Sequence, residues 1–94
     1  MNMEKNSESL FKQAKKRGVP EATAHSLAEY VTKGRNVGGF LEAVLKNDLK
    51  ESFNRADLDN RSALFKIVMF LYNDCPMNCW GSPKKYEEWE GLDE

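Results

Sequence analysis

One apolar run, at residues 63–72, constrains the fold more than any other part of the chain; it reads Ala-Leu-Phe-Lys-Ile-Val-Met-Phe-Leu-Tyr. Periodicity alone does not separate a buried strand from a buried helix in such a run. The flanking residues favour a helix, because Asp57 and Asp59 precede the run as N-cap candidates and Pro76 follows it. We therefore expect a helix over about residues 58–74, here called the central helix.

The rest of the chain supports this interpretation, because it contains no second strand-like run with which a strand could pair. The run is about half as long as a membrane span, so the helix should be buried in protein. A helix that is apolar all round needs neighbours on most sides. We expect an all-α fold, a single small domain of four or five short helices packed around the central helix. Its buried residues should be Leu64, Ile67, Val68 and Leu71, and its outer side should carry Phe65, Met69, Phe70 and Tyr72.

The length and charge of the chain limit its class. Its 94 residues allow one domain, which we expect at residues 7–90, between a disordered N-terminus at residues 1–6 and an acidic C-terminal end at 91–94 that should fray. The net charge of −1 argues against a dedicated nucleic-acid-binding protein, which would neutralise phosphates. No N-terminal apolar segment marks the chain for export, so we expect a cytoplasmic protein.

Turn and capping residues divide the chain before the central helix. Ser7 is a natural N-cap for a first helix that should stop at Gly18, and Pro20 suits the first turn of a second helix that should end at Gly34. A third helix should begin near Phe40. After the central helix, Ser82 and Pro83 should start a last short helix, from which Tyr86 and Trp89 can fold back on the core.

Asp48 falls on the apolar face of the third helix if that helix is projected onward. The spacing of Asp48-Leu49-Lys50-Glu51 is that of a capping box, which favours a break at Asn47 and a new helical turn through Phe53. The alternative is a buried Asp48 with a perturbed, functional carboxylate.

Gly38 and Gly39 precede the third helix and form the best candidate for an anion site. Two glycines at a helix start expose unpaired N–H groups, and Lys33 and Arg35 lie close in the sequence. The alternative is a tight turn that packs closely on another helix. The pattern matches neither a Walker loop nor a dinucleotide-binding fingerprint.

The sequence offers no clear catalytic or metal-binding set. Cys75 and Cys79 lack the further ligands that zinc requires, and we expect reduced thiols that bind no metal. The only histidine, His25, should lie in solvent between Glu21 and Glu29. No nucleophile and base pair up, and no cofactor loop is present, so we expect a protein that is not an enzyme and has no cofactor.

Several motifs occur in order between about residues 19 and 89. They are Leu27-x-x-Tyr30-Val31-x-x-Gly34, Gly38-Gly39-Phe40-Leu41-x-Ala43-Val44-Leu45-x-Asn47-Asp48-Leu49, Arg55-Ala56-Asp57, Leu71-Tyr72-Asn73 and Trp80-Gly81-Ser82-Pro83. In this set the chain resembles a family of short uncharacterised proteins encoded by bacteriophages and prophages. The resemblance implies a phage-infected bacterial cytoplasm as the setting. It also marks five polar or aromatic positions as helix caps or as an interaction surface, namely Asn47, Asp48, Arg55, Asp57 and Trp80.

We therefore expect a small phage accessory protein that binds a host protein without catalysis, for example as an inhibitor of a host-defence component. The alternative is an oligomeric protein that sequesters a small anionic ligand of the nucleotide type at residues 38–40, with Lys33 and Arg35 as counter-charges and Trp80 or Tyr30 stacking on a base. A homodimer is expected in either case, because a chain of 94 residues has difficulty covering the central helix on all sides.

Overall fold

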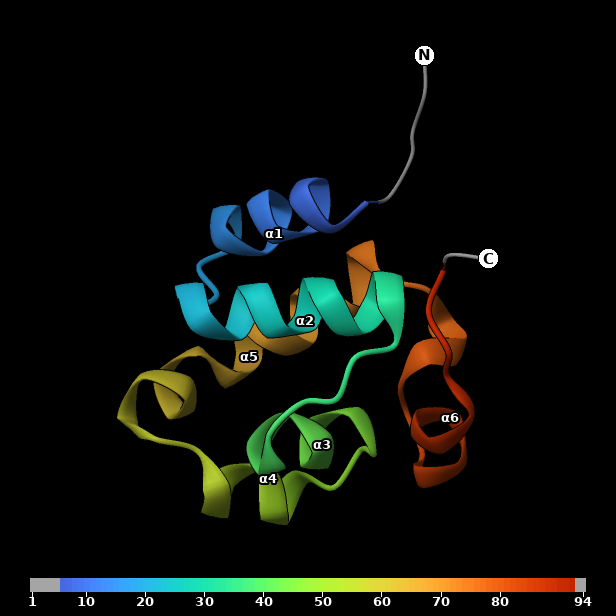
Figure 1. The fold of residues 1–94 in the computed structure, drawn as a ribbon. Coiled ribbons are helices and arrows are strands. Elements are labelled where there is room, and N and C mark those ends of the chain that lie inside the picture. Colours follow the sequence, from blue (N-terminus) through green and yellow to red (C-terminus); the bar gives the residue numbers. More distant parts are fainter. Residues whose placement is uncertain (1–5, 93–94) are drawn as a thin grey trace.

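The computed structural model describes residues 6–92. These residues form six α-helices and one short 3-10 helix: α1 (Ser7–Lys16), α2 (Glu21–Lys33), α3 (Gly39–Leu45), α4 (Leu49–Arg55), α5 (Leu58–Asp74), η1 (Met77–Cys79) and α6 (Pro83–Glu88) (Figure 1). No strand occurs in the described range, and the expected all-α class is confirmed. The central helix of the sequence prediction is α5. No helix among residues 6–92 is both long enough and apolar enough to cross a membrane.

The first helix begins with a reciprocal cap. The Asn6 side chain accepts a hydrogen bond from the Ser9 backbone N–H at 2.8 Å, and the Ser9 hydroxyl accepts one from the Asn6 N–H at 3.1 Å. The N-cap is thus Asn6 and not Ser7, whose hydroxyl donates to Glu29 at 2.6 Å instead. Asn6 was expected to belong to a disordered terminus and is ordered by this cap, whereas residues 1–5 lie outside the described range.

The chain breaks between α3 and α4 where the sequence predicted it. Asn47 has a positive φ of 65°, which turns the chain after α3. Asp48 is the N-cap of α4, and its carboxylate accepts a hydrogen bond from the Glu51 N–H at 3.1 Å. Because Asp48 is exposed, the alternative of a buried functional carboxylate at this position is wrong.

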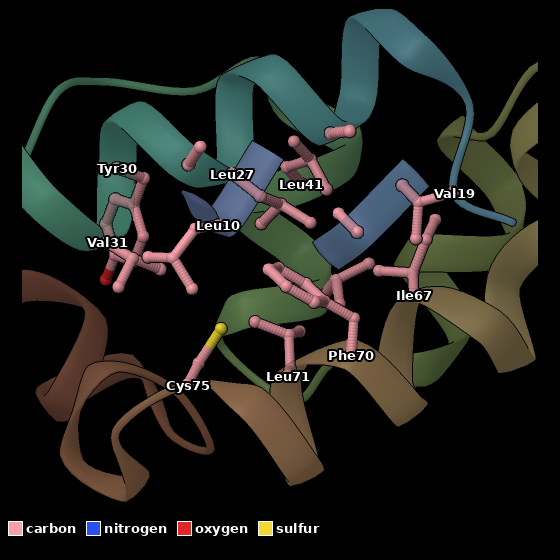
Figure 2. Packing of buried hydrophobic residues seen from close by; sticks show 14 of the residues in the cluster. Leu10, Val19, Leu27, Tyr30, Val31, Leu41, Ile67, Phe70, Leu71 and Cys75 are labelled. Atoms are coloured by element: carbon pink, nitrogen blue, oxygen red, sulfur yellow. The ribbon is translucent and has the colours of Figure 1, made fainter. Parts of the chain in front are cut away.

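The helices assemble around one core. In Figure 1, α1 lies along α2, α5 passes behind α2, the α3 and α4 pair lies below, and α6 closes one end. Figure 2 shows side chains from α1, α2, α3 and α5 meeting in the space between these helices. Helix α2 contributes seven buried residues and α5 contributes four, so both helices supply much of the core.

The buried face of α5 differs from the predicted one. Its buried residues are Ala63, Ile67, Phe70 and Leu71. Ile67 and Leu71 were predicted correctly, but Leu64 and Val68 are only half-buried, and Phe70, which was placed on the outer side, is fully buried. Because both sides of α5 are apolar, the sequence alone did not decide which side turns inward. The observed rotation puts Phe70, the largest of the fully buried side chains, into the core.

The chain after α6 returns to the core, in a stretch that we call the C-terminal segment (residues 89–92). The Trp89 indole N–H donates to the Tyr30 carbonyl at 3.0 Å, and the Leu92 N–H donates to the carbonyls of Val31 and Thr32 at 3.0 Å. These acceptors are carbonyl groups near the carboxyl end of α2, where the last four lack partners within the helix. The expected fraying therefore does not occur up to Leu92, and Asp93 and Glu94 lie outside the described residues.

Candidate functional site

The outer side of α5 carries a row of exposed apolar side chains. Leu58, Phe65, Met69 and Tyr72 are 78, 75, 37 and 77 % exposed. At 3.6 residues per turn these four positions fall within an arc of about 60°, and Ile67 on the buried side lies opposite its middle. We call this row the outer stripe. Helix α5 is therefore apolar on two opposite sides, and the other residues in the range 6–92 cover only one of them.

The stripe continues beyond the helix into a hollow. Tyr72, Met77, Trp80, Gly81 and Lys85 line a depression of about 440 Å³. Met77 is 80 % exposed and adds another apolar side chain to this end of the stripe. We call this depression the end hollow.

The loop that builds the end hollow is fixed from below. The Tyr30 hydroxyl donates to the Cys79 carbonyl at 2.8 Å, and the Gly81 N–H donates to the Leu45 carbonyl at 2.8 Å. The Tyr30 ring also stacks on Tyr86, with ring centroids 5.6 Å apart. Burial raises the pKa of the Tyr30 hydroxyl well above its ordinary value, which keeps it protonated as a donor. The walls of the hollow are therefore held by a buried hydrogen-bond network.

Two cations beside α5 are turned toward their own chain. The Arg61 guanidinium lies 4.5 Å from the centroid of the Phe53 ring, and its Nε donates to the Phe53 carbonyl at 3.2 Å. The Lys66 side chain lies over Gly18, where a Cβ atom would come within 2.8 Å of it. Both contacts direct charge away from the outer stripe.

The structure does not bring the predicted anion-binding residues together. Lys33 and Arg35 lie 3.7 and 3.2 Å from the Glu29 carboxylate, which also accepts the hydrogen bond from Ser7. That hydrogen bond, together with the two cations, lowers the pKa of Glu29. The two cations therefore offset a carboxylate of their own chain.

The two glycines of that prediction lie at a different place. Gly38 and Gly39 line a hollow of about 280 Å³ between α2, α3 and α5, together with Arg55, Asp57 and other residues. A Cβ atom on Gly39 would lie 2.7 Å from Nη1 of Arg55. Gly39 thus lies beside the end of the Arg55 side chain.

Four of the five predicted surface residues have structural roles. Asn47 forms the turn after α3, and Asp48 and Asp57 cap α4 and α5. Arg55 forms an ion pair with Glu51 at 2.9 Å. Trp80 alone among the five lies at the outer stripe, in the wall of the end hollow.

Arg55 lies between two hollows, one shared with Asp57 and the other with Asp48. Both carboxylates are used in helix caps, and neither lining includes a histidine or cysteine among the described residues. His25 is exposed on α2, edge-on to the Phe11 ring at 6.2 Å. The charged groups around Arg55 are therefore two helix-capping carboxylates.

The cysteines are not joined in a disulfide bond, and both are buried. Burial raises the pKa of the Cys79 thiol to about 12, which disfavours the thiolate that binds metals or attacks disulfides. Within residues 6–92 no group of three or more His, Cys, Asp or Glu side chains could hold a metal ion.

Comparison of the chain with protein-family models, with curated proteins and with solved structures gives no match in any of the three.

Sequence reasoning found part of the outer stripe. It placed Phe65, Met69 and Tyr72 on the outer side of the helix, but it missed Leu58 and Met77. The signal for Leu58 was present, because it precedes Phe65 by seven residues and therefore lies on the same side of the helix. Met77 follows the helix, and only the folded loop brings it beside Tyr72.

Proposed function

We propose that the protein acts by binding another protein without catalysis, and that the outer stripe and the end hollow are its binding surface. The observation that carries this proposal is the exposure of four large apolar side chains on one face of α5. Large contiguous apolar patches on soluble proteins mark interaction sites. Aromatic residues and methionine, which dominate this row, are also the types enriched at protein interfaces.

The shape of the surface favours a helical segment of the partner. The stripe from Leu58 to Tyr72 is about 21 Å long at 1.5 Å per residue, and it ends in a hollow that could accept one side chain. An amphipathic helix presents apolar residues at spacings of three and four, which match the stripe. We therefore propose that the partner binds with one apolar helix face along α5.

The resemblance to short phage-encoded proteins supplies the context of the proposal. In that setting the partner is a host protein in the bacterial cytoplasm, for example a defence component whose interaction surface the phage protein covers. The alternative, a sequestered nucleotide-type anion, loses its two counter-charges because Lys33 and Arg35 face Glu29. No observation favours it over protein binding.

A photo-cross-linking residue at position 72 tests the proposal. Tyr72 is 77 % exposed on the stripe, and Leu49 on α4, 71 % exposed, provides a matched control position. On irradiation in bacterial lysate, we expect position 72 to form an adduct with a foreign protein and position 49 to form none with it. The partner, once purified, should bind the wild-type chain and lose at least about tenfold in affinity with Phe65→Glu. Equal adducts at both positions, or no foreign adduct at position 72, would contradict the proposal.

A further inference from the structure

We propose that in the free protein the outer stripe is covered by the same stripe of a second copy, in an antiparallel two-fold dimer. The dimer is argued from the surface of α5 and the end hollow, independently of the proposed function. Its consequence, that self-pairing masks the surface meant for the partner, rests on the proposed function.

The stripe and the end hollow make this face complementary to itself. A two-fold interface needs protruding and receiving features on one surface, because each copy uses the same patch. With the two-fold axis near Met69, antiparallel pairing places Phe65 of one copy beside Tyr72 of the other, at the edge of the end hollow. Leu58 of one copy then lies beyond the carboxyl end of α5 of the other copy. Each copy thus covers exposed apolar side chains of the other.

The charges at the two ends of the stripe favour the antiparallel orientation. The amino end carries the exposed carboxylates of Asp57 and Asp59, and Arg61 beside them is turned toward Phe53. At the other end, Lys85 is the charged side chain that lines the end hollow, and the exposed Glu87 and Glu88 of α6 are not part of that lining. Antiparallel pairing brings unlike ends together, whereas parallel pairing would oppose like charges.

The size of the patch suits a dimer of modest affinity. Phe65 and Tyr72 are 75 and 77 % exposed, and a fully exposed aromatic side chain can bury about 150–250 Å². Leu58, Met69 and Met77 add to this area, which brings the patch near the roughly 800 Å² per partner of a standard interface. We therefore expect a dissociation constant in the micromolar range.

Sedimentation analysis of the purified full chain over a range of concentrations tests the dimer. The mass should rise from the chain value of 10.8 kDa to twice that value. Phe65→Glu should weaken association at least tenfold, because it places a charge on the buried stripe. Leu49→Glu, an equally drastic change at an exposed position of α4, should leave it unchanged. A monomer at all concentrations, or a dimer indifferent to Phe65→Glu, would overturn the proposal.

Two single cysteine variants test the orientation. Met69→Cys lies near the proposed axis, so under mild oxidation it should form a disulfide bond with the same residue of the second copy. The native Cys75 and Cys79 are buried and should not compete. Leu58→Cys lies far from Leu58 of the other copy in an antiparallel pair and should not cross-link. Cross-linking of both variants indicates parallel pairing, and cross-linking of neither places the interface elsewhere. Either result overturns the proposed geometry.

The masking of the partner surface has a separate readout. The cross-linked Met69→Cys dimer should bind the partner found by photo-cross-linking at least tenfold more weakly than the same variant after reduction. Equal binding would overturn the masking and leave the dimer standing. The mass measurements use the purified chain alone. Failure to find a foreign partner would therefore contradict the proposed function and leave the dimer unaffected.

Discussion

Gly34 and Gly91 meet backbone to backbone where the C-terminal segment lies on the end of α2. A Cβ atom on Gly91 would lie 2.9 Å from the Gly34 nitrogen and 2.6 Å from the Thr32 carbonyl oxygen, and one on Gly34 would lie 2.8 Å from the Glu90 carbonyl. Both glycines also have positive φ values, 70° and 101°. Side chains are therefore excluded here by space and by backbone conformation.

We expect Gly34→Ala and Gly91→Ala each to lower the free energy of unfolding by about 1–3 kcal/mol, because each adds a strained residue and a contact that must shift. Urea denaturation measures the loss. Gly38→Ala is the control: no atom lies within 4 Å of its Cβ position, and its φ is −77°. It should be nearly neutral, and equal losses at Gly38 and Gly91 would contradict the close packing.

Phe70 and Phe65 provide a matched pair on one helix. Phe70 is fully buried and Phe65 is 75 % exposed. Phe70→Ala should lower the free energy of unfolding by about 3–5 kcal/mol through loss of core contacts and the cavity left behind. Phe65→Ala should change it by about 0.5 kcal/mol or less, measured at concentrations where the chain is monomeric. The reverse order would show that α5 is rotated relative to the fold described above.

Glu29 should make stability depend on acid pH. Its pKa in the folded protein lies below the ordinary value of 4.5, so its contribution is present above the unfolded pKa and is lost as pH falls through the folded one. The difference in unfolding free energy between wild type and Glu29→Gln should therefore shrink between about pH 6 and about pH 3. A difference that stays constant over this range would contradict the prediction.

Two substitutions of Asp57 test whether its carboxylate acts as a helix cap or has a further role. Its carboxylate accepts a hydrogen bond from the Asn60 N–H at 2.8 Å at the start of α5. Asp57→Ala should cost about 1 kcal/mol of stability, and Asp57→Asn, which also caps well, should retain most of it. Thermal unfolding of the two variants measures this. A large loss with asparagine would show that the charge of Asp57 matters beyond the cap.

The helix boundaries were predictable because their signals are local. Gly34 ends α2, Asp48 caps α4 and Ser82 caps α6, each through contacts within a few residues along the chain. The N-cap of α1 was wrongly predicted because its signal is not local. The Ser7 hydroxyl donates a hydrogen bond to Glu29, 22 positions away, and Asn6 forms the cap instead.

The buried face of α5 and the path of the C-terminal segment were not predictable in this way. Phe65 and Phe70 are the same residue type within one apolar run. Only the packing of the folded chain decides that Phe70 is buried and Phe65 is exposed. The carbonyl groups of Val31 and Thr32 that hold Leu92 are main-chain atoms, which carry no residue-type signal. The pairing of Lys33 with Glu29 could have been predicted from the sequence. The two residues are four positions apart, which places them on one face of α2 as an ion pair.

The C-terminal segment also affects how the protein should fold and unfold in time. Its indole hydrogen bond joins Trp89 to Tyr30 across 59 positions, whereas α1 with α2 and α3 with α4 are pairs of neighbouring helices. Contacts that close long loops form late, after local helix pairs. Interactions absent from the folding transition state act mainly on the unfolding rate. Loosening the contact between Gly34 and Gly91 should therefore shorten the lifetime of the native state while leaving the rate of its formation almost unchanged.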